Sequence, residues 1–596
     1  MNTRELRIAE YEKNIHAIDK ELSNLQKRSK IYVILKLIFF ILTGISCYFI
    51  YLDFYWIQLL LLLLFGGLYI LVFIYDNRCC AIIEKLKKKK TIFSNEISYF
   101  KGNFSVFSTG EEYIDYNHEY SFDLDLFGRD SLYNRINRTV TKQGSNALAK
   151  YFTELSFDND KIKSNQFAIK EIAELNDWRV DFLSNNYLTN NIDLFSKEIK
   201  LSRIANVLKD TKLAHFLVIL TILSSLLAVI NLISVVFPLA FIFIQLILVS
   251  FISKPLSRLS MYSNELYKEY SGYLVIMKLI KKQSFKSDKL NKIKHKLFES
   301  EINPLEAFSE LTEILNFFEM RCNVLMYFFS NMFLMSDVFL LKKVLKWKSQ
   351  YSKFLSGWLE YVGEVDALVS FATYAYNNPL NTYPEILNEP SENILEIENI
   401  YHPFLAEDRA VPNSFVVKKR NISIITGANM AGKSTFLRTI GIAYILANTG
   451  LSVPAKNFRF SNVSLFSSMR TSDNLTQNIS YFNAELLRLE KLINCLKINK
   501  YTLVILDEIL KGTNSKDKLK GSQMFLDAIS KYQVSAIVAT HDLELAKYYE
   551  ENNKYFSNYC FEIEIAENIK YSYKIRKGIV QNLNASYLLQ TLLSKT

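Results

Sequence analysis

Two long apolar stretches constrain this chain more than any other feature. The first covers residues 31–75 and is interrupted by Asp53, whereas the second, Leu213–Ser253, contains no Asp, Glu, Lys or Arg. A bilayer core takes about 20 apolar residues per helix. Each stretch is therefore long enough for two spans joined by a turn, at Asp53 in the first and between Asn231 and Pro238 in the second. The sequence thus predicts two transmembrane helical hairpins, at residues 31–76 and 213–253.

Basic residues flank both hairpins and predict their orientation. They are Lys27, Arg28, Lys30, Arg78, Lys85 and Lys87–Lys90 around the first, and Lys209, Lys212, Lys254 and Arg258 around the second. Because positively charged flanks stay on the cytoplasmic side, both hairpins are expected to enter and leave from the cytoplasm. We predict a multi-pass protein of the cell (inner) membrane, in contact with the lipid bilayer, with a cytoplasmic N-terminus and C-terminal domain. The alternative is a large buried helical core, in which charge-free stretches of this length are rare.

Composition agrees with a helical, intracellular chain. Nine prolines and 17 glycines in 596 residues favour long helices. The spacing of the six cysteines predicts neither a disulfide framework nor a zinc ribbon. The net charge of +11 could attract nucleic acid. However, much of it lies beside the predicted spans, where anionic lipid and topology account for it, so it is weak evidence for DNA.

Helical periodicity predicts the segments around the hairpins. They are a heptad-like cytoplasmic helix at 1–30, a basic cytoplasmic helix at 77–115, and a helical core in two parts at 116–212 and 254–390. The helix at 1–30 is expected to pack on the helix that returns after Tyr75. Val324–Leu341 is a possible fifth span, but Asp337 interrupts it and lysines follow, which favours a core helix.

The strongest chemical signal begins with the apolar run Ile422–Ile425. It continues through a GxxxxGKS motif, Gly427 to Ser434, into an apolar helix, which is the context of a phosphate-binding loop. The two glycines, Gly427 and Gly432, let backbone N–H groups face phosphate oxygens. Lys433 would reach the β and γ phosphates, and the Ser434 hydroxyl would bind Mg²⁺. The alternative is a loop without a ligand.

Two further apolar strands end in polar residues. Leu503–Leu506 is followed by Asp507 and Glu508, the pattern of a Walker B strand, in which Asp507 would belong to the magnesium shell and Glu508 would polarise the attacking water. The third strand, 535–539, leads to His541, which could contact the γ phosphate. The alternatives are an exposed acidic strand end and an ordinary loop histidine.

These motifs resemble those of the MutS proteins, a family within the ABC-type ATPases. The resemblance rests on the TG-x-N-M-x-GKST core, on YTLVILDEILKGTNSKD, on ATHDLEL, on IYHPFL and on LDLFGRDSLYNRINRTVTKQGSNALA. It implies an α/β ABC-type P-loop ATPase domain at 391–596, C-terminal to an all-α MutS-like core and lever region. By the same resemblance, Asn429 and Thr435 also bind the nucleotide. The sequence does not single out the aromatic residue that stacks on the adenine.

The resemblance also implies a homodimer in which a serine of one subunit approaches the γ phosphate bound by the other. Ser480 is the matching serine, although Asn478 stands where a glycine is usual and Tyr481 where a small hydroxyl residue is usual. The chain lacks the LSGGQ signature of ABC transporters. Its first 100 residues, a hairpin and charged helices, leave no room for the family's mismatch-reading domain.

The sequence therefore predicts a membrane-anchored, MutS-like ATPase. It would bind and hydrolyse ATP with Mg²⁺ at a dimer interface and couple this to binding of DNA, mismatched or branched. The rival interpretation is a membrane-associated signalling or remodelling ATPase that does not bind nucleic acid.

Overall fold

The computed structural model divides the chain into two compact units, Met1–Phe107 with Leu175–Asn186, and Ser108–Glu174 with Tyr187–Thr596. The residues it describes are 3–52, 55–185, 211–299, 301–321, 323–387, 391–405, 410–428, 430–470, 481–498, 501–512, 514–550, 555–565 and 569–580. Asp53, Asn429 and Ser480, which the sequence analysis singled out, lie outside these ranges.

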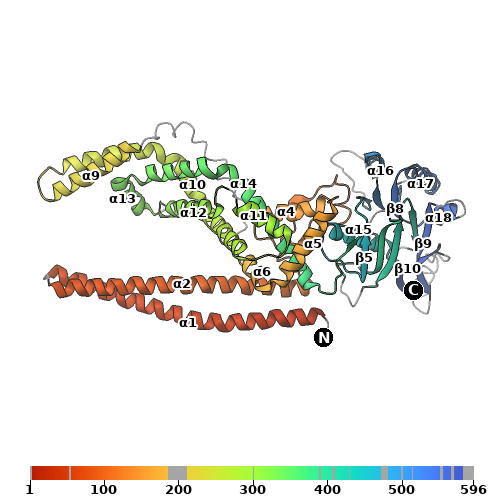
Figure 1. Ribbon diagram of the computed structural model, residues 1–596, viewed down its shortest axis with the longest axis horizontal. Coiled ribbons are helices and arrows are strands. Elements are labelled where there is room, and N and C mark those ends of the chain that lie inside the picture. The colour runs from red at the N-terminus through yellow and green to blue at the C-terminus, as the bar shows by residue number, and fades with distance from the viewer. Residues whose placement is uncertain are drawn as a thin grey trace, which may run out of the picture. The chain divides into compact units, whose positions relative to one another are not determined.

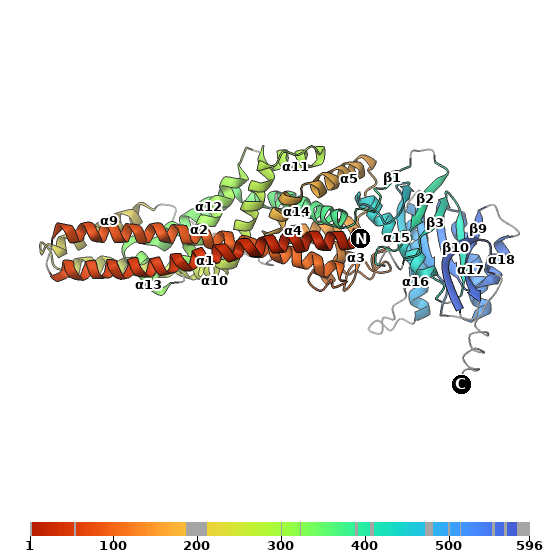
Figure 2. The ribbon, with the colours of Figure 1, turned by 90° about the horizontal axis from the view of Figure 1, so that it is seen from below.

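The first unit is built on two long helices that run antiparallel and side by side, α1 (Thr3–Leu52) and α2 (Trp56–Phe100) (Figure 2). The rings of Tyr11 and Phe93 lie 5.6 Å apart, and Lys90 pairs with Asp19 at 2.5 Å. The heptad-like stripe of the helix predicted at residues 1–30, called the N-terminal stripe below, therefore packs on the helix that returns after Tyr75, as predicted. Neither helix ends at the expected boundaries near residues 30 and 76, so the polar and apolar halves of each form one continuous rod.

A short third helix, α6 (Asn176–Leu183), completes this unit. Its Asp181 lies 3.0 Å from Lys85 and 2.7 Å from Lys89 of α2. Two of the lysines after the first apolar stretch therefore pair with a carboxylate of the same unit.

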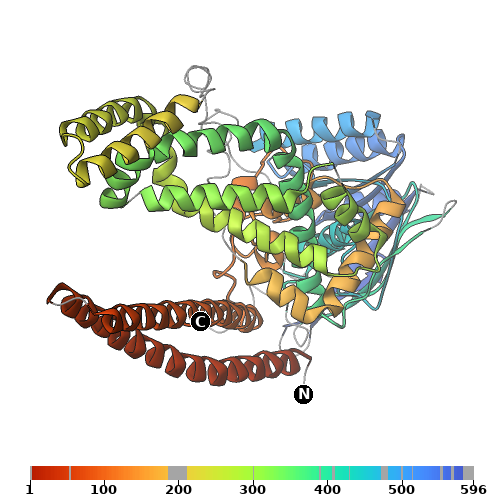
Figure 3. The ribbon, with the colours of Figure 1, turned by 60° about the vertical axis from the view of Figure 1, so that its left-hand side comes forward.

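Three helices are long and apolar enough to cross a membrane, judged by length and composition over the described residues: α1, α2 and α9 (Lys212–Val229). α10 (Val236–Lys282) begins with a shorter apolar segment, Val236–Phe251. α9 and the start of α10, coloured yellow, fold back on each other (Figure 3). The turn lies where it was predicted, but Pro238 already belongs to the first turn of α10, where its missing N–H costs no helical hydrogen bond.

The helical part of the second unit packs around the long helix α14. Its helices are α3 (Leu132–Ile136), α4 (Lys142–Thr153), α5 (Asn159–Glu174), α11 (Asp288–Phe298), α12 (Pro304–Arg321), α13 (Val324–Leu334) and α14 (Ser336–Asn377). α4 crosses α14 so closely that a Cβ on Gly144 would lie only 2.1 Å from a carboxylate oxygen of Asp366. Asp366 is buried and accepts hydrogen bonds from the backbone N–H groups of Val140 and Thr141, which fixes the start of α4.

The single core helix predicted over Val324–Leu341 is wrong. α13 and α14 meet at an angle of 89°, and Met335 between them has a positive φ of 47°. The Asn331 side chain accepts a hydrogen bond from the backbone N–H of Asp337, so it caps a new helix where the old one stops. Most apolar side chains of α13 are exposed rather than in the core.

The C-terminal part of the second unit contains two sheets (Figure 1). The larger has the order β10-β9-β4-β8-β7-β6, with β10 antiparallel to β9 and the other pairs parallel. Its strands are β4 (Ile422–Gly427), β6 (Ser464–Ser468), β7 (Thr502–Asp507), β8 (Val534–Thr540), β9 (Phe556–Ile565) and β10 (Ile569–Lys577). β4, β7 and β8 contain the three strands predicted from the sequence.

Helices connect and cover these parallel strands, as parallel pairing requires. They are α15 (Lys433–Thr449), α16 (Tyr481–Ile498), α17 (Ser515–Ser530) and α18 (Leu543–Glu550). The smaller sheet has the order β1-β5-β2-β3. Its strands are β1 (Glu385–Ile386), β2 (Asn393–Ile400), β3 (Asn413–Lys418) and β5 (Asn457–Phe460).

Candidate functional site

The carboxyl ends of three neighbouring strands place the predicted site residues together. In the register of the large sheet, Thr426 of β4 lies opposite Thr540 of β8, and Asp507 of β7 lies opposite Ala539. The residues that follow each strand therefore emerge at one edge of the sheet. Ligands of open parallel sheets bind at this edge.

Close approaches of neighbouring residues, and a positive φ in one case, explain why glycine occupies two positions of the loop between β4 and α15. A Cβ on Gly427 would lie 3.0 Å from the carbonyl oxygen of Phe561. Gly432 has a φ of 106°, and a Cβ there would lie 3.2 Å from the ring of Tyr573. Lys433, the first residue of α15, donates hydrogen bonds to the carbonyl oxygens of Gly427 (2.7 Å) and Ala428 (3.0 Å). The lysine thus lies across the loop at the helix N-terminus.

Four charged or titratable side chains meet beside this loop. The Lys433 ammonium lies 3.3 Å from Nε2 of His541, and that nitrogen lies 3.2 Å from a carboxylate oxygen of Glu508. Lys518 of α17 lies 3.4 Å from the other oxygen of Glu508. Glu508 has a positive φ of 60°, a conformation that costs free energy in a non-glycine residue and is often found at functional sites.

Burial changes the titration of this cluster. It lowers the pKa of Lys433 to about 8, against the opposing charges of Asp507 and Glu508. Burial and the neighbouring Lys433 ammonium also lower the pKa of His541, while Glu508 raises it. Lys433 therefore loses its proton more easily than an ordinary lysine, and a neutral His541 lies between it and Glu508.

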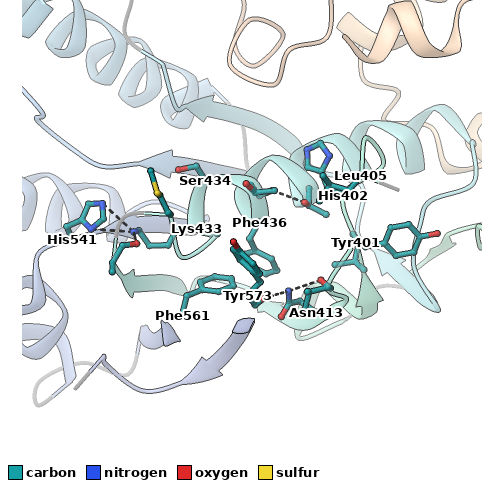
Figure 4. Close-up of a pocket in the computed structure, with 17 residues that line it drawn as sticks. Tyr401, His402, Leu405, Asn413, Lys433, Ser434, Phe436, His541, Phe561 and Tyr573 are labelled. Atoms are coloured by element: carbon teal, nitrogen blue, oxygen red, sulfur yellow. Dashed lines mark hydrogen bonds between the residues drawn. The ribbon is translucent and has the colours of Figure 1, made fainter. Parts of the chain in front are cut away.

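A cavity of about 500 Å³ opens beside the cluster (Figure 4). It is lined by residues of the loop and α15, of the smaller sheet and its flanking segment, and of β9 and β10: Ile400, Tyr401, His402, Leu405, Val411, Asn413, Ala428, Met430, Gly432, Lys433, Ser434, Thr435, Phe436, Thr439, His541, Phe561 and Tyr573. A cavity of this size can hold a small-molecule cofactor or nucleotide.

Tyr573, which no sequence motif indicates, presents an exposed aromatic ring to the cavity. Phe436 and Phe561 pack edge to face at 5.6 Å and are buried, whereas Tyr573 is 43% exposed. Asn413 fixes its position: the side-chain amide donates to the carbonyl oxygen of Tyr573 (2.9 Å) and accepts from the N–H of Ile575 (2.9 Å). The contact joins β3 to a bulge in β10, which no local sequence signal predicts.

His402 lies on the opposite side of the cavity, in the IYHPFL segment. Its Nδ1 accepts a hydrogen bond from the backbone N–H of Phe404 at 3.1 Å. Burial, with the positive charges of Arg438 and Arg135, lowers the pKa of His402 to about 4. This histidine is therefore a neutral hydrogen-bonding residue at neutral pH.

Both ends of α15 are tied to the helical region of the same unit. Near the phosphate loop, Arg438 pairs with Asp125 at 2.6 Å, and Arg470 pairs with the same carboxylate. At the far end, the amide of Asn448 exchanges two hydrogen bonds with the backbone of Ser156, at 2.8 and 2.9 Å. A shift of α15 would therefore reach the helices directly.

Asp123 makes a second tie between the same segment and the sheet. It accepts hydrogen bonds from the backbone N–H groups of Met469 and Arg470, both at 2.8 Å, and from Arg488 of α16 at 2.8 Å. The predicted trans residue Ser480 falls between Arg470 and α16, outside the described residues.

The structure thus brings together most of the predicted site. Gly432, Lys433, Ser434, Thr435 and His541 line the cavity. Gly427 and Glu508 contact Lys433 and His541. Asp507 ends β7 one residue before Glu508. Among the described residues, no group of three or more His, Cys, Asp or Glu side chains could hold a metal by itself.

Acid should destabilise the protein through His402. The histidine is neutral in both states above its ordinary pKa of 6.5. Below pH 6.5 this histidine takes up a proton in the unfolded chain, whereas in the folded protein it stays neutral down to about pH 4. The free energy of unfolding therefore decreases as the pH is lowered through this window. We expect urea titrations to show that the free energy of unfolding falls by about 2 kcal/mol from pH 6.5 to 5. His402→Asn, which can keep an acceptor for the N–H of Phe404, should reduce this loss.

His16→Asn is the matched control for this measurement, because the side chain of His16 on α1 is exposed. It should leave the pH dependence unchanged. An equal acid response in the His402→Asn variant and the unmodified chain would contradict the assignment.

Comparison with known proteins identifies the region that carries the site. Residues 423–591 match the family model of MutS domain V. The chain is 33% identical over 225 residues to the DNA mismatch repair protein MutS of Persephonella marina, covering 37% of this chain and 25% of that protein. It is 30% identical over 238 residues to Endonuclease MutS2 of Carboxydothermus hydrogenoformans, covering 39% of this chain and 29% of that protein.

A human protein, MutS protein homolog 4, is 29% identical over 236 residues, which are 37% of this chain and 24% of that protein. The chain thus spans about a quarter of the length of the curated relatives it matches. The residues matched by the family model include the loop after β4, most of the large sheet and part of the cavity lining. Residues 423–591 are therefore similar to MutS domain V, called domain V below, and the chain shares this domain with the relatives named above.

Proposed function

We propose that the cavity binds ATP and that domain V, as a P-loop ATPase of the ABC type, hydrolyses it. The observation that supports this most is the meeting of Lys433, Glu508 and His541 at the edge of the sheet, beside a cavity of about 500 Å³. These groups come from three separate strand ends. Their convergence supplies a cation for phosphates and a carboxylate for a water molecule at one place.

The loop and the start of α15 would hold the triphosphate. Backbone N–H groups at a helix N-terminus favour anions, and Lys433 would exchange its two carbonyl acceptors for phosphate oxygens. The Ser434 hydroxyl and the Asp507 carboxylate fit Mg²⁺, which is commonly bound by one or two protein oxygens together with substrate phosphates. When bound, Mg²⁺ would neutralise charge on the phosphates.

Glu508 would act as the base for hydrolysis. It would accept a proton from the attacking water, while Lys518 holds one of its oxygens in place. His541, neutral and next to Lys433, would donate a hydrogen bond to the γ phosphate. Water attacks the γ phosphorus, the bond to the bridging oxygen breaks, and ADP and phosphate leave.

Replacing Glu508 should separate binding from hydrolysis. We expect Glu508→Gln to retain ATP affinity within a few-fold and to lose at least about 100-fold in kcat, because general-base catalysis contributes 10²–10⁴-fold. Steady-state phosphate release and nucleotide titration of the detergent-solubilised chain would measure this. Glu544→Gln, an exposed residue at the start of α18, should behave like the unmodified chain, and retained turnover in Glu508→Gln would contradict the mechanism.

Tyr573 should stack on the adenine ring. Stacking of a base on an aromatic side chain contributes about 1–3 kcal/mol, so Tyr573→Ala should weaken ATP binding by roughly 5–150-fold. Tyr573→Phe should keep most of the affinity, since it keeps the ring. Equal affinity in the alanine variant would show that the base lies elsewhere.

We further propose that two copies close around two nucleotides, with Ser480 of one subunit approaching the γ phosphate of the other. The ties of α15 to Asp125 and Ser156 would carry the closing motion into the helical region. The Glu508→Gln variant with ATP and Mg²⁺ should therefore elute as a dimer in size-exclusion chromatography. A monomer under these conditions would contradict this step.

The apolar helices support a second part of the proposal, an anchor in the cell (inner) membrane. α1, α2 and α9 are long and apolar enough to span it, and the basic flanks predict that domain V faces the cytoplasm. The lipid bilayer is then a permanent partner of the chain.

DNA is the proposed ligand of the helical region, because two of the relatives that share domain V are named for DNA mismatch repair and as an endonuclease. We expect gel-shift titrations of the solubilised chain with branched and mismatched duplexes to show binding that weakens steeply with salt, as phosphate contacts require. Absence of salt-sensitive binding to any of these DNAs would favour the rival, a signalling or remodelling ATPase without a nucleic-acid ligand.

A further inference from the structure

α13 presents an apolar surface that the protein itself does not cover. Six of its eleven residues expose large apolar side chains by 47–69%: Val324, Leu325, Met326, Phe328, Phe329 and Leu334. Isolated exposed apolar side chains are ordinary, but a contiguous group of this size indicates an interaction surface. The helix is therefore built to contact something apolar.

The polar side chains near the C-terminal end of α13 are hydrogen-bonded within the protein. Asn331 is buried, donates to the carbonyl oxygen of Tyr327 and accepts from the N–H of Asp337. Ser330 also donates to the carbonyl oxygen of Tyr327. At the N-terminus, the side chain of Asn323 accepts hydrogen bonds from two backbone N–H groups of the first turn. Polar groups of a helix in hydrocarbon need hydrogen-bond partners within the protein, because no water is present there.

An ion pair joins the two segments that flank α13. Arg321, just before the helix, donates from Nε to both carboxylate oxygens of Asp337, just after it, at 3.0 and 3.1 Å. Both side chains are buried, at 9% and 2% exposed. Eleven residues of helix extend only about 16 Å, about half of a bilayer core. The segment is thus too short to cross, and the Arg321–Asp337 pair joins the residues on either side of it.

The neighbours of α13 are the apolar helices of the same unit. α13 packs against both α9 and α10, away from the two sheets (Figure 1). Their outer residues are also apolar and exposed, as at Leu226 of α9 and Phe243 of α10. The exposed surface of α13 is therefore continuous with that of the second hairpin.

We propose that α13 is a re-entrant membrane helix. It inserts among the lipid acyl chains beside the α9–α10 hairpin and returns to the cytoplasmic side through the bend at Met335, where the Arg321–Asp337 pair closes the loop. The inference rests on the proposed membrane anchor. It adds a shallow third element whose insertion would be linked, through α14, to α4.

Spin labels can test the depth of α13 and the anchor separately. A single cysteine would replace Phe329 in a full-length chain without its six native cysteines, reconstituted in phosphatidylcholine–phosphatidylglycerol vesicles. We expect the nitroxide at Phe329 to relax strongly with oxygen and weakly with a nickel chelate. Leu223→Cys on α9 is the membrane control and Lys346→Cys on α14 the aqueous control.

The outcomes distinguish the re-entrant helix from the membrane anchor on which it rests. Lipid-like relaxation at both Phe329 and Leu223 supports the re-entrant helix. Water-like relaxation at Phe329 with a lipid-like Leu223 overturns it and leaves the anchor intact. Water-like relaxation at both positions overturns the anchor and, with it, the inference. Dipolar broadening at Phe329 with low access to both reagents would show that a second copy covers α13, which also overturns the proposal.

A topology experiment tests the return to the same side. Asn316→Cys on α12 and Lys346→Cys on α14 are exposed positions before and after α13. In sealed vesicles with domain V outside, a membrane-impermeant maleimide should label both to the same extent. Labelling of only one of them would show that the segment crosses the bilayer and would overturn the proposal.

Discussion

The parallel pairing of β4, β8 and β7 is the constraint on which the candidate site depends. Each strand places its last residues at the same edge, so Lys433, His541 and Glu508 meet although more than 70 residues separate the first from the third. A shift of one residue in either register would displace the residues that follow one strand relative to those that follow its neighbour. The chemistry of the site is therefore a consequence of hydrogen bonding within the sheet.

The same arrangement explains how a nucleotide could act at a distance. α15 starts at the loop after β4, is buried along most of its length, and is tied at both ends to the segments around Asp125 and Ser156. A closely packed helix moves as a rigid element rather than deforming. Small changes around the phosphates would thus be passed to α4, α5 and α14 rather than absorbed in the loop.

With the proposed membrane anchor, the apolar helices would face lipid as well as water. In the first unit, α1 and α2 join apolar halves to polar halves that pair through Tyr11, Phe93 and Lys90. In the second, α13 keeps its polar groups inside the bend and its apolar side chains outside. Both patterns follow from the same rule, that backbone and side-chain polar groups must find partners where water is absent.

The sequence by itself determined the three strands, the loop glycines, the charged residues at the strand ends and the long apolar helices, because each depends on local spacing. It also predicted that the N-terminal stripe packs on α2. It did not predict Tyr573, which reaches the cavity only because Asn413 holds a bulge of β10, or the bend at Met335, which depends on Asn331 and on the Arg321–Asp337 pair. Such contacts join residues whose neighbours in the sequence carry no signal, so only the tertiary structure decided them.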